Sequence, residues 1–256
     1  MSKLEIHQIP VLNDNYVYLF RESDSGKVGV VDPAVAAPVL EKLAELGWKL
    51  THIINTHHHG DHTGGNLALK EKTGCTIVGA KKDAARIPGI DIGLEDGDIF
   101  EFGTETARVF EVPGHTVGHI AYWFENSDAL FCGDTLFALG CGRLFEGTPA
   151  QMWHSLEKFR ALPDNTRVYC AHEYTEANGR FALSVEPDNM ALKERFAEIV
   201  ELRKRKKPTV PSTLGEEKAT NPFLRADNPS LAAELQLSAH DPVEVFAETR
   251  RRKDSF

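Results

Sequence analysis

The chain has 256 residues, of which 41% are hydrophobic and 26% are charged. These values are typical of a globular protein with one large domain and a small one, or with two domains. The formal net charge of −9 argues against a general nucleic-acid binder, because such a protein gains affinity by neutralising phosphates. No apolar run approaches the ~20 residues of a membrane span, and residues 1–5 carry no apolar signal-peptide core. We therefore expect a cytoplasmic protein that binds neither nucleic acid nor membrane.

The four cysteines form no Cys-x-x-Cys pair; they are Cys75, Cys132, Cys141 and Cys170. Because there is also no export signal, reduced thiols in a cytosolic protein are a better interpretation than disulfides. Cys132 and Cys170 lie in apolar, strand-like runs, where a cysteine is more typically a small buried side chain than a metal ligand.

The first two thirds of the chain alternate short strands with amphipathic helices. The predicted strands, bounded by turn signals, cover residues 4–12, 15–22, 28–32, 52–55, 76–80, 98–102, 107–112, 120–124 and 129–132. A helix is predicted from Pro38 to Gly47, where apolar residues recur at a helical period and glycine ends the run, and another over residues 66–72. The order does not follow strict βαβ alternation, so we expect packed sheets covered by helices.

The last third changes to a helical character. Residues 189–207 carry apolar residues at helical spacing, and further helices are predicted to begin at Asn228-Pro229 and at Asp241-Pro242. Two basic runs lie here, at 203–207 and 250–253. A charge run is usually a solvated helix face, and we interpret the first run in this way.

A His-rich heptapeptide at residues 56–62 reads Thr-His-His-His-Gly-Asp-His. On extended backbone, residues two apart point to the same side, so His57 and His59 can share one metal ion. The glycine lets the chain turn, so that Asp61 and His62 face a second point. The alternative is a solvated loop that happens to be rich in histidine. Four imidazoles and a carboxylate in six residues favour two metal ions side by side.

Three further ligand candidates each follow an apolar run directly: His115, Asp134 and His172. Taken singly, such residues are more often capping aspartates or hydrogen-bonded histidines, although loops at strand ends commonly carry chemistry. With the heptapeptide they make seven N/O ligands, which give two divalent ions four protein contacts each if one carboxylate bridges. Imidazole and carboxylate without thiolate suit zinc, iron or manganese.

At these motifs the sequence resembles the metallo-β-lactamase superfamily. The motifs are Thr-His-x-His-x-Asp-His at 56–62, Pro-Gly-His-Thr at 113–116, Gly-Asp-Thr at 133–135 and the later His172. The resemblance implies an α/β fold, the αβ/βα sandwich, with a smaller C-terminal α-helical domain. Residues 1–173 would then form the metallo-β-lactamase-like catalytic domain, and residues 174–256 a helical glutathione-binding domain.

The resemblance also implies how the ligands are shared between two divalent ions, expected to be zinc, with iron or manganese as alternatives. The first ion would be bound by His57, His59 and His115. The second would be bound by Asp61, His62 and His172, with Asp134 bridging both; Asp61 and Asp134 would also be the catalytic residues. His58 should point away from its neighbours, and His119 should orient a ligand without binding metal.

Longer stretches resemble the glyoxalase II (hydroxyacylglutathione hydrolase) family. They are Phe-Cys-Gly-Asp-Thr-Leu-Phe at 131–137, Gly-Cys-Gly-Arg-Leu-Phe-Glu-Gly-Thr at 140–148, Cys-Ala-His-Glu-Tyr-Thr at 170–175, Asn-Pro-Phe-Leu-Arg at 221–225 and Arg-Arg-Arg-Lys-Asp-Ser-Phe at 250–256. The implied reaction, a step of methylglyoxal detoxification, hydrolyses S-(2-hydroxyacyl)glutathione, chiefly S-D-lactoylglutathione, to glutathione and D-lactate. A metal-bridging hydroxide would attack the thioester carbonyl. Metal binding supplies hydroxide at neutral pH, and a thiolate leaves without a protonating residue.

The same resemblance implies that the partner is this small-molecule substrate, and we expect a monomer. Its substrate-binding residues would be Arg143, Phe145, His172, Tyr174, Arg250 and Lys253. A basic fork suits the carboxylates of glutathione. The sequence departs from one branch of the family, which has lysine at position 143 and tyrosine at position 145. Arg143 keeps the charge, whereas Phe145 has no hydroxyl to donate.

Two other classes of function are alternatives. A mononuclear-iron glutathione persulfide dioxygenase of the same superfamily is disfavoured by the complete second-metal set and the full helical tail. A non-catalytic metal-binding protein or a nuclease relative is disfavoured by the complete ligands and the acidic charge.

Overall fold

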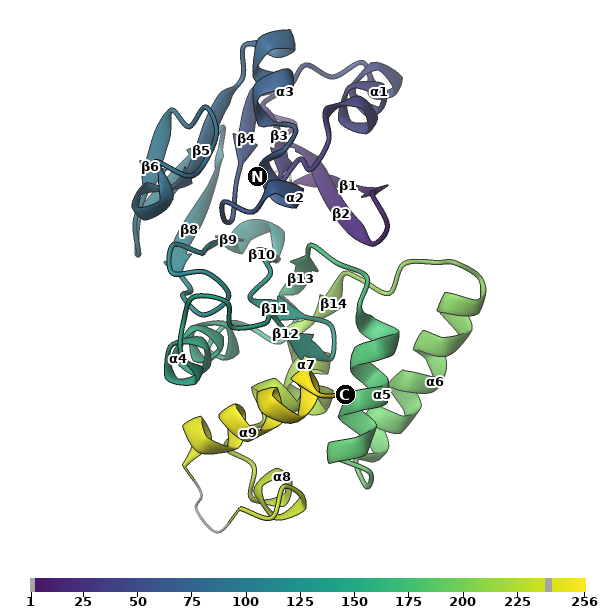
Figure 1. The fold of residues 1–256 in the computed structure, drawn as a ribbon. Coiled ribbons are helices and arrows are strands. Elements are labelled where there is room, and N and C mark those ends of the chain that lie inside the picture. Colours follow the sequence, from purple (N-terminus) through teal and green to yellow (C-terminus); the bar gives the residue numbers. More distant parts are fainter. Residues whose placement is uncertain (1–2, 238–240) are drawn as a thin grey trace. The chain divides into compact units, whose positions relative to one another are not determined.

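In the computed structural model, which describes residues 3–237 and 241–256, the chain divides into two units that interleave along the sequence (Figure 1). Unit 1 comprises Met1–Glu111 and Gly118–Gly133, and unit 2 comprises Val112–Val117 and Asp134–Phe256. The domains at 1–173 and 174–256 are a different division of the chain, and they stay a prediction. Among the described residues no helix is long and apolar enough to cross a membrane. The prediction on a signal peptide falls partly on residues 1–2, outside the described part.

Unit 1 opens with a six-stranded sheet in the order β1-β2-β3-β4-β5-β6. Its strands are β1 (Glu5–Val11), β2 (Asn15–Arg21), β3 (Val28–Val31), β4 (His52–Ile54), β5 (Thr76–Ala80) and β6 (Ile92–Leu94). The first three strands pair antiparallel and the later ones parallel. The parallel crossovers carry α1 (Ala36–Leu46), α2 (Gly60–Thr63), α3 (Asn66–Thr73) and the 3-10 turn η1 (Lys81–Asp83). Gly47 ends α1 in the left-handed conformation (φ 65°) that glycine adopts without a steric cost.

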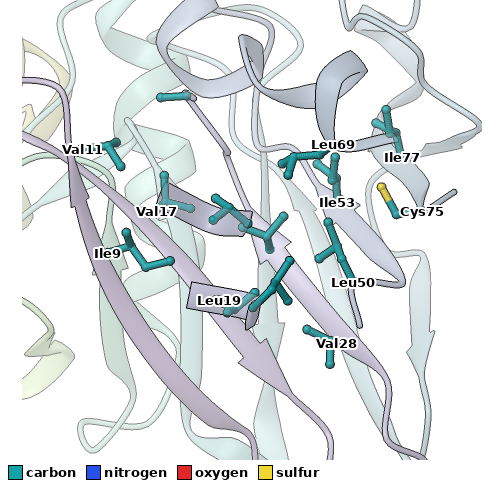
Figure 2. Close-up of a cluster of buried hydrophobic side chains, with 14 of the residues drawn as sticks. Ile9, Val11, Val17, Leu19, Val28, Leu50, Ile53, Leu69, Cys75 and Ile77 are labelled. Carbon is teal, nitrogen blue, oxygen red and sulfur yellow. The ribbon is translucent and has the colours of Figure 1, made fainter. Parts of the chain in front are cut away.

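Strand β2 shows how the alternation of side chains builds two layers of core. Val17 and Leu19 face the cluster that α1 and α3 cover, where they pack with Ile53 and Leu69 (Figure 2). The side chains between them point to the other face of the sheet, as the period of two requires. Each fully buried aliphatic side chain contributes about 1.5–3 kcal/mol. The helices therefore cover one face of this sheet because its alternate residues are aliphatic.

The other face of this sheet packs on a second set of strands in unit 1. They are β7 (Ile99–Phe102), β8 (Glu105–Glu111), β9 (Ile120–Phe124) and β10 (Ala129–Gly133), joined antiparallel with the 3-10 turn η2 (Glu125–Ser127) before β10. Aromatic rings fill the space between the layers: Phe20 lies 4.8 Å from Phe102 and 5.5 Å from Phe131 between ring centroids. Such contacts add to burial, so the predicted sheets covered by helices are confirmed in this unit.

Unit 2 is mainly helical. Its strands are β11 (Leu136–Phe137), β12 (Gly140–Cys141), β13 (Arg167–Cys170) and β14 (Ser212–Thr213), paired β11 with β12 and β13 with β14. Its helices are α4 (Pro149–Arg160), α5 (Thr175–Val185), α6 (Met190–Lys204), α7 (Leu214–Thr220), η3 (Pro222–Leu224), α8 (Pro229–Glu234) and α9 (Pro242–Asp254). The last two begin where predicted, with Asn228 and Asp241 as side-chain N-caps. Helix α6 packs on α5 around Leu139, Ala182, Leu192 and Ile199.

Candidate metal centre

The His-rich loop of unit 1 follows β4 and turns into the short helix α2. His57 and His59 lie together, with His57 Nε2 3.0 Å from His59 Nδ1. The hydroxyl of Thr56 lies 3.1 Å from His57 Nδ1. This hydroxyl donates its proton elsewhere (below), so Nδ1 of His57 must be the protonated nitrogen and Nε2 is left to bind a metal ion.

Behind this loop lies a buried carboxylate that the sequence analysis missed. Asp32 follows β3 with φ 47° and accepts hydrogen bonds from Thr56 N at 2.8 Å and Thr56 Oγ1 at 2.6 Å. It also lies 3.0 Å from Nδ1 of buried His62. A carboxylate only accepts, so His62 Nδ1 carries the proton and Nε2 faces away from Asp32. The signal available in the sequence was an Asp-Pro pair directly after an apolar strand, which reads as a simple turn.

Asp61 and His62 form the second part of this half of the site. His62 Nε2 lies 3.5 Å from Asp61 Oδ2. The Asp61 carboxylate is in turn held by Asn15, whose Nδ2 donates to Asp61 Oδ2 at 3.1 Å and to its backbone oxygen at 3.3 Å. Asn15, at the start of β2, is buried and was not identified from the sequence. Buried polar groups therefore fix the orientation of three of the four candidate ligands in the loop, which are His57, Asp61 and His62.

Two further histidines, one in the loop and one beside it, are outside the proposed ligand set. His58 points to Asp83, with its Nδ1 3.0 Å from Asp83 Oδ2, and Asp83 also pairs with Arg86. The ring of His119, fully buried, stacks on His57 at 4.6 Å between centroids and 17° between planes. A Cβ on Gly133 would lie 2.9 Å from His119 Cε1 and closer still to Thr56, so glycine is required where β10 ends against this loop.

Unit 2 holds the other three candidate ligands. Asp134 Oδ2 lies 3.5 Å from His115 Nε2 and 3.4 Å from His172 Nε2. Ligands about 2.0–2.1 Å from a tetrahedral ion are about 3.3 Å from each other. All three side chains are at least nine-tenths buried, so this cluster has the spacing and donor chemistry of metal ligands on both sides of one carboxylate.

Each imidazole of this cluster is oriented by a neighbour. His115 Nδ1 donates to the backbone oxygen of Arg143 at 2.8 Å, which leaves Nε2 toward Asp134. The His172 ring stacks on Tyr174 at 4.8 Å with 1° between planes. Phe145, an exposed side chain, lies with its ring 5.1 Å from His115.

The predicted substrate cations also gather in unit 2. Burial lowers the pKa of Lys253, and the positive charges of Arg250 and Arg143 lower it further. Arg250 is buried: it donates to Cys141 O at 3.0 Å, pairs with Asp254 at 2.8 Å and lies over the Phe223 ring. These positive charges repel one another, so a bound anion would stabilise the cluster. Arg143 is the exposed side chain among them.

None of the four cysteines has the character of a nucleophile. All are buried free thiols. Burial raises the pKa of Cys141 to about 11 and that of Cys170 to about 12. A thiol must ionise to attack, so at neutral pH these side chains pack in the core and are not nucleophiles.

The chain matches two family models that together cover most of its length. Residues 12–172 match the model described as "Metallo-beta-lactamase superfamily", and residues 173–256 match "Hydroxyacylglutathione hydrolase C-terminus". A protein named hydroxyacylglutathione hydrolase from Methylococcus capsulatus is 63% identical over 253 residues, 99% of each chain. One of the same name from Rhodospirillum rubrum is 56% identical over 256 residues, 100% of each chain. Among solved structures, ETHE1 from Myxococcus xanthus matches with a TM-score of 0.68 at 26% identity, over 98% of this chain and 99% of that one.

Proposed function

Because the chain belongs to the hydroxyacylglutathione hydrolase (glyoxalase II) family of the metallo-β-lactamase superfamily, we propose that it hydrolyses S-(2-hydroxyacyl)glutathione thioesters. The chief substrate is S-D-lactoylglutathione, and the products are glutathione and D-lactate. The observation that carries this proposal is the pairing, within unit 2, of a buried His-Asp-His cluster with a group of cations. The first suits metal-assisted hydrolysis, and the second suits a substrate that bears carboxylates.

The proposed centre would hold two divalent ions per chain. The residues that would bind the first ion are His57, His59 and His115. Those that would bind the second are Asp61, His62 and His172, and Asp134 would serve both. The donor set of imidazole and carboxylate supports zinc and also fits iron or manganese. When bound, such ions would lower the pKa of a coordinated water to about 7 and polarise a carbonyl.

The chain's own residues supply orientation and charge. Asp61, kept in place by Asn15, accepts a hydrogen bond from the attacking water and so fixes its direction. Asp32, Thr56 and the Arg143 backbone oxygen keep three of the imidazoles protonated on Nδ1, those of His62, His57 and His115. No residue is needed to protonate the leaving group, because a thiolate is a stable product near neutral pH.

The substrate's glutathione moiety is bound by side chains of unit 2. The proposed contacts are Arg143, Phe145, His172, Tyr174, Arg250 and Lys253. Arg143 and Lys253 bind the carboxylates as charged hydrogen-bond donors. Phe145 offers only an apolar contact, so this position contributes less than a tyrosine would.

The remaining parts of the proposal concern organisation. A functional boundary near residue 173 separates the catalytic part from the C-terminal, glutathione-binding part. The protein acts as a cytoplasmic monomer on a small molecule and needs no nucleic acid or membrane.

Metal analysis combined with a thioester assay tests this function. Protein purified without chelators should carry about two ions per chain and hydrolyse S-D-lactoylglutathione. Asp134→Ala should lower the affinity for both ions, whereas His172→Ala should lower that of one. A protein that saturates at one iron and consumes oxygen with glutathione persulfide would replace the proposal by the dioxygenase alternative.

A further inference from the structure

The hairpin segment, residues 136–141, is a part of unit 2 to which the proposed mechanism gives no role. It follows Asp134 and precedes Arg143 in the sequence. Its strands β11 and β12 have two residues each, so their pairing supplies few hydrogen bonds. Leu139 at the turn has φ 58°, a left-handed conformation that costs a non-glycine residue free energy. Contacts from outside the segment must therefore fix its shape.

Two fully buried polar side chains hold the turn. Asn221 Nδ2 donates to the carbonyl oxygens of Phe137 and Gly140, at 3.1 and 3.0 Å. Glu217 Oε2 accepts the backbone N–H of Leu139 at 2.9 Å. The two side chains also bond to each other, at 3.0 Å. Because the donors and acceptors lie away from water, the loss of either would leave a buried polar group without its partner.

Two more side chains donate hydrogen bonds to the backbone of the hairpin segment. Asn178 Nδ2, from α5, donates to Ala138 O at 3.2 Å. Arg250 Nη1, from α9, donates to Cys141 O at 3.0 Å. We call these four side chains the cradle: Asn178, Glu217, Asn221 and Arg250. The fit is close, because a Cβ on Gly140 would lie 2.5 Å from Asn178 Nδ2.

The chain that leaves the hairpin segment leads directly to a metal-ligand candidate. The backbone oxygen of Arg143 accepts the Nδ1 proton of His115 at 2.8 Å. A Cβ on Gly142 would lie 3.1 Å from the same Nδ1 and 2.0 Å from Asp134 O. A shift of this backbone would therefore move the hydrogen bond that sets the tautomer of His115, and it would press on the residue that carries the bridging carboxylate.

We propose that the cradle is a set of positioning residues through which the C-terminal helices fix the metal ligand His115 and the guanidinium of Arg143. His115 is fixed through its hydrogen bond to the Arg143 backbone oxygen. The guanidinium is fixed because the backbone sets the direction of the Arg143 side chain. The first effect rests on the proposed metal centre, and the second rests on the proposed substrate. The inference gives a role to the Asn-Pro-Phe-Leu-Arg motif at 221–225, whose first residue bonds the hairpin segment twice. It also gives Arg250 a positioning role besides its charge.

The test compares Asn221→Ala with a matched control in the purified, metal-loaded protein. Glu186→Gln is the control, because Glu186 is a buried carboxylate of the same helical region that pairs with Arg225 at 2.9 Å and not with the hairpin segment. Release of zinc to a chromophoric chelator should be about 10- to 100-fold faster in Asn221→Ala, the effect typical of losing an outer-shell partner. The KM for S-D-lactoylglutathione should rise as well. Glu186→Gln should lower the melting temperature while zinc release and KM stay as in the wild type.

Two more variants keep the test decisive. Glu217→Gln retains an oxygen that accepts the Leu139 N–H, so zinc release should be slower than in Glu217→Ala. If Asn221→Ala does not fold, Asn178→Ala, which removes a single hydrogen bond, takes its place. Wild-type zinc release and KM in a folded Asn221→Ala or Asn178→Ala protein would overturn the inference and leave the cradle a purely stabilising feature. A wild-type protein that binds zinc but leaves glutathione thioesters intact would refute the proposed function, and the zinc-release comparison would remain valid.

Discussion

Replacing Asp32 by asparagine would test whether a buried carboxylate selects the metal-binding nitrogen of His62. Asp32 Oδ1 accepts the backbone N–H of Thr56, and Oδ2 accepts the Thr56 hydroxyl and His62 Nδ1. Asparagine has the same size, but its amide nitrogen only donates. If that nitrogen takes the place of Oδ1 it opposes the Thr56 N–H. If it takes the place of Oδ2 it opposes the protonated Nδ1 of His62.

The two orientations of the amide have different costs. The first leaves a buried N–H without an acceptor, which costs about 1–3 kcal/mol of folding free energy. The second favours the His62 tautomer with its proton on Nε2, the nitrogen that faces Asp61. Loss of such a partner typically lowers metal affinity 10- to 100-fold, or about 1.4–2.8 kcal/mol. We therefore expect Asp32→Asn to lower chiefly the affinity for the ion that His62 is proposed to bind.

Chelator-competition titration of the purified variant measures this effect, and denaturant unfolding measures the accompanying loss of stability. Asp83→Asn is the matched control, because Asp83 is also buried and pairs with His58, a histidine outside the proposed ligand set. The control should lose stability and keep both affinities. An Asp32→Asn protein that binds two ions with wild-type affinities would refute the reasoning.

Three further predictions concern substrate binding and the nucleophile. Arg143→Ala removes the guanidinium but keeps the backbone oxygen. The KM for S-D-lactoylglutathione should rise by about one to two decades, which corresponds to the loss of one charged hydrogen bond. The hydrolysis of a small thioester without the tripeptide should stay as in the wild type. Because burial and the neighbouring guanidinium groups lower the pKa of Lys253, its ammonium loses the proton below the usual lysine range as pH rises. The wild-type KM should therefore increase at alkaline pH, and Lys253→Arg should remove that increase in a KM–pH profile. Alanine at Cys141 or Cys170 should leave turnover largely unchanged, and an acyl group found on either thiol by mass spectrometry would contradict a metal-activated nucleophile.

The part of the site that could be predicted from sequence is the part whose chemistry is local. Imidazoles and carboxylates at ligand spacing are rare outside metal sites, so His57, His59 and Asp61 stand out without any knowledge of the fold. Strands could also be predicted where one face is aliphatic and the other aromatic, as in β2, because burial of both faces gives the side chains a period of two.

The residues that orient the ligands could not be identified in this way. Asp32 and Asn15 are ordinary turn residues in the sequence, and their roles depend on contacts with residues 24 to 46 positions away. Helix α4 was not predicted although its start carries a usable signal: Thr148 caps the helix, Pro149 occupies the first turn and Gln151 completes a capping box. Helix α5 begins without any side-chain cap hydrogen bond, so the sequence carries no capping signal for its start.

The burial of the thiols bears on how such an enzyme tolerates its own product. Hydrolysis of a glutathione thioester releases a thiol, and mixed disulfides with glutathione form through protein thiolates. Burial raises the pKa of Cys141 to about 11 and that of Cys170 to about 12, so both thiols stay protonated at neutral pH. The fold thus insulates the centre from thiol–disulfide exchange, so its activity should follow the supply of substrate and metal independently of the ratio of reduced to oxidised glutathione.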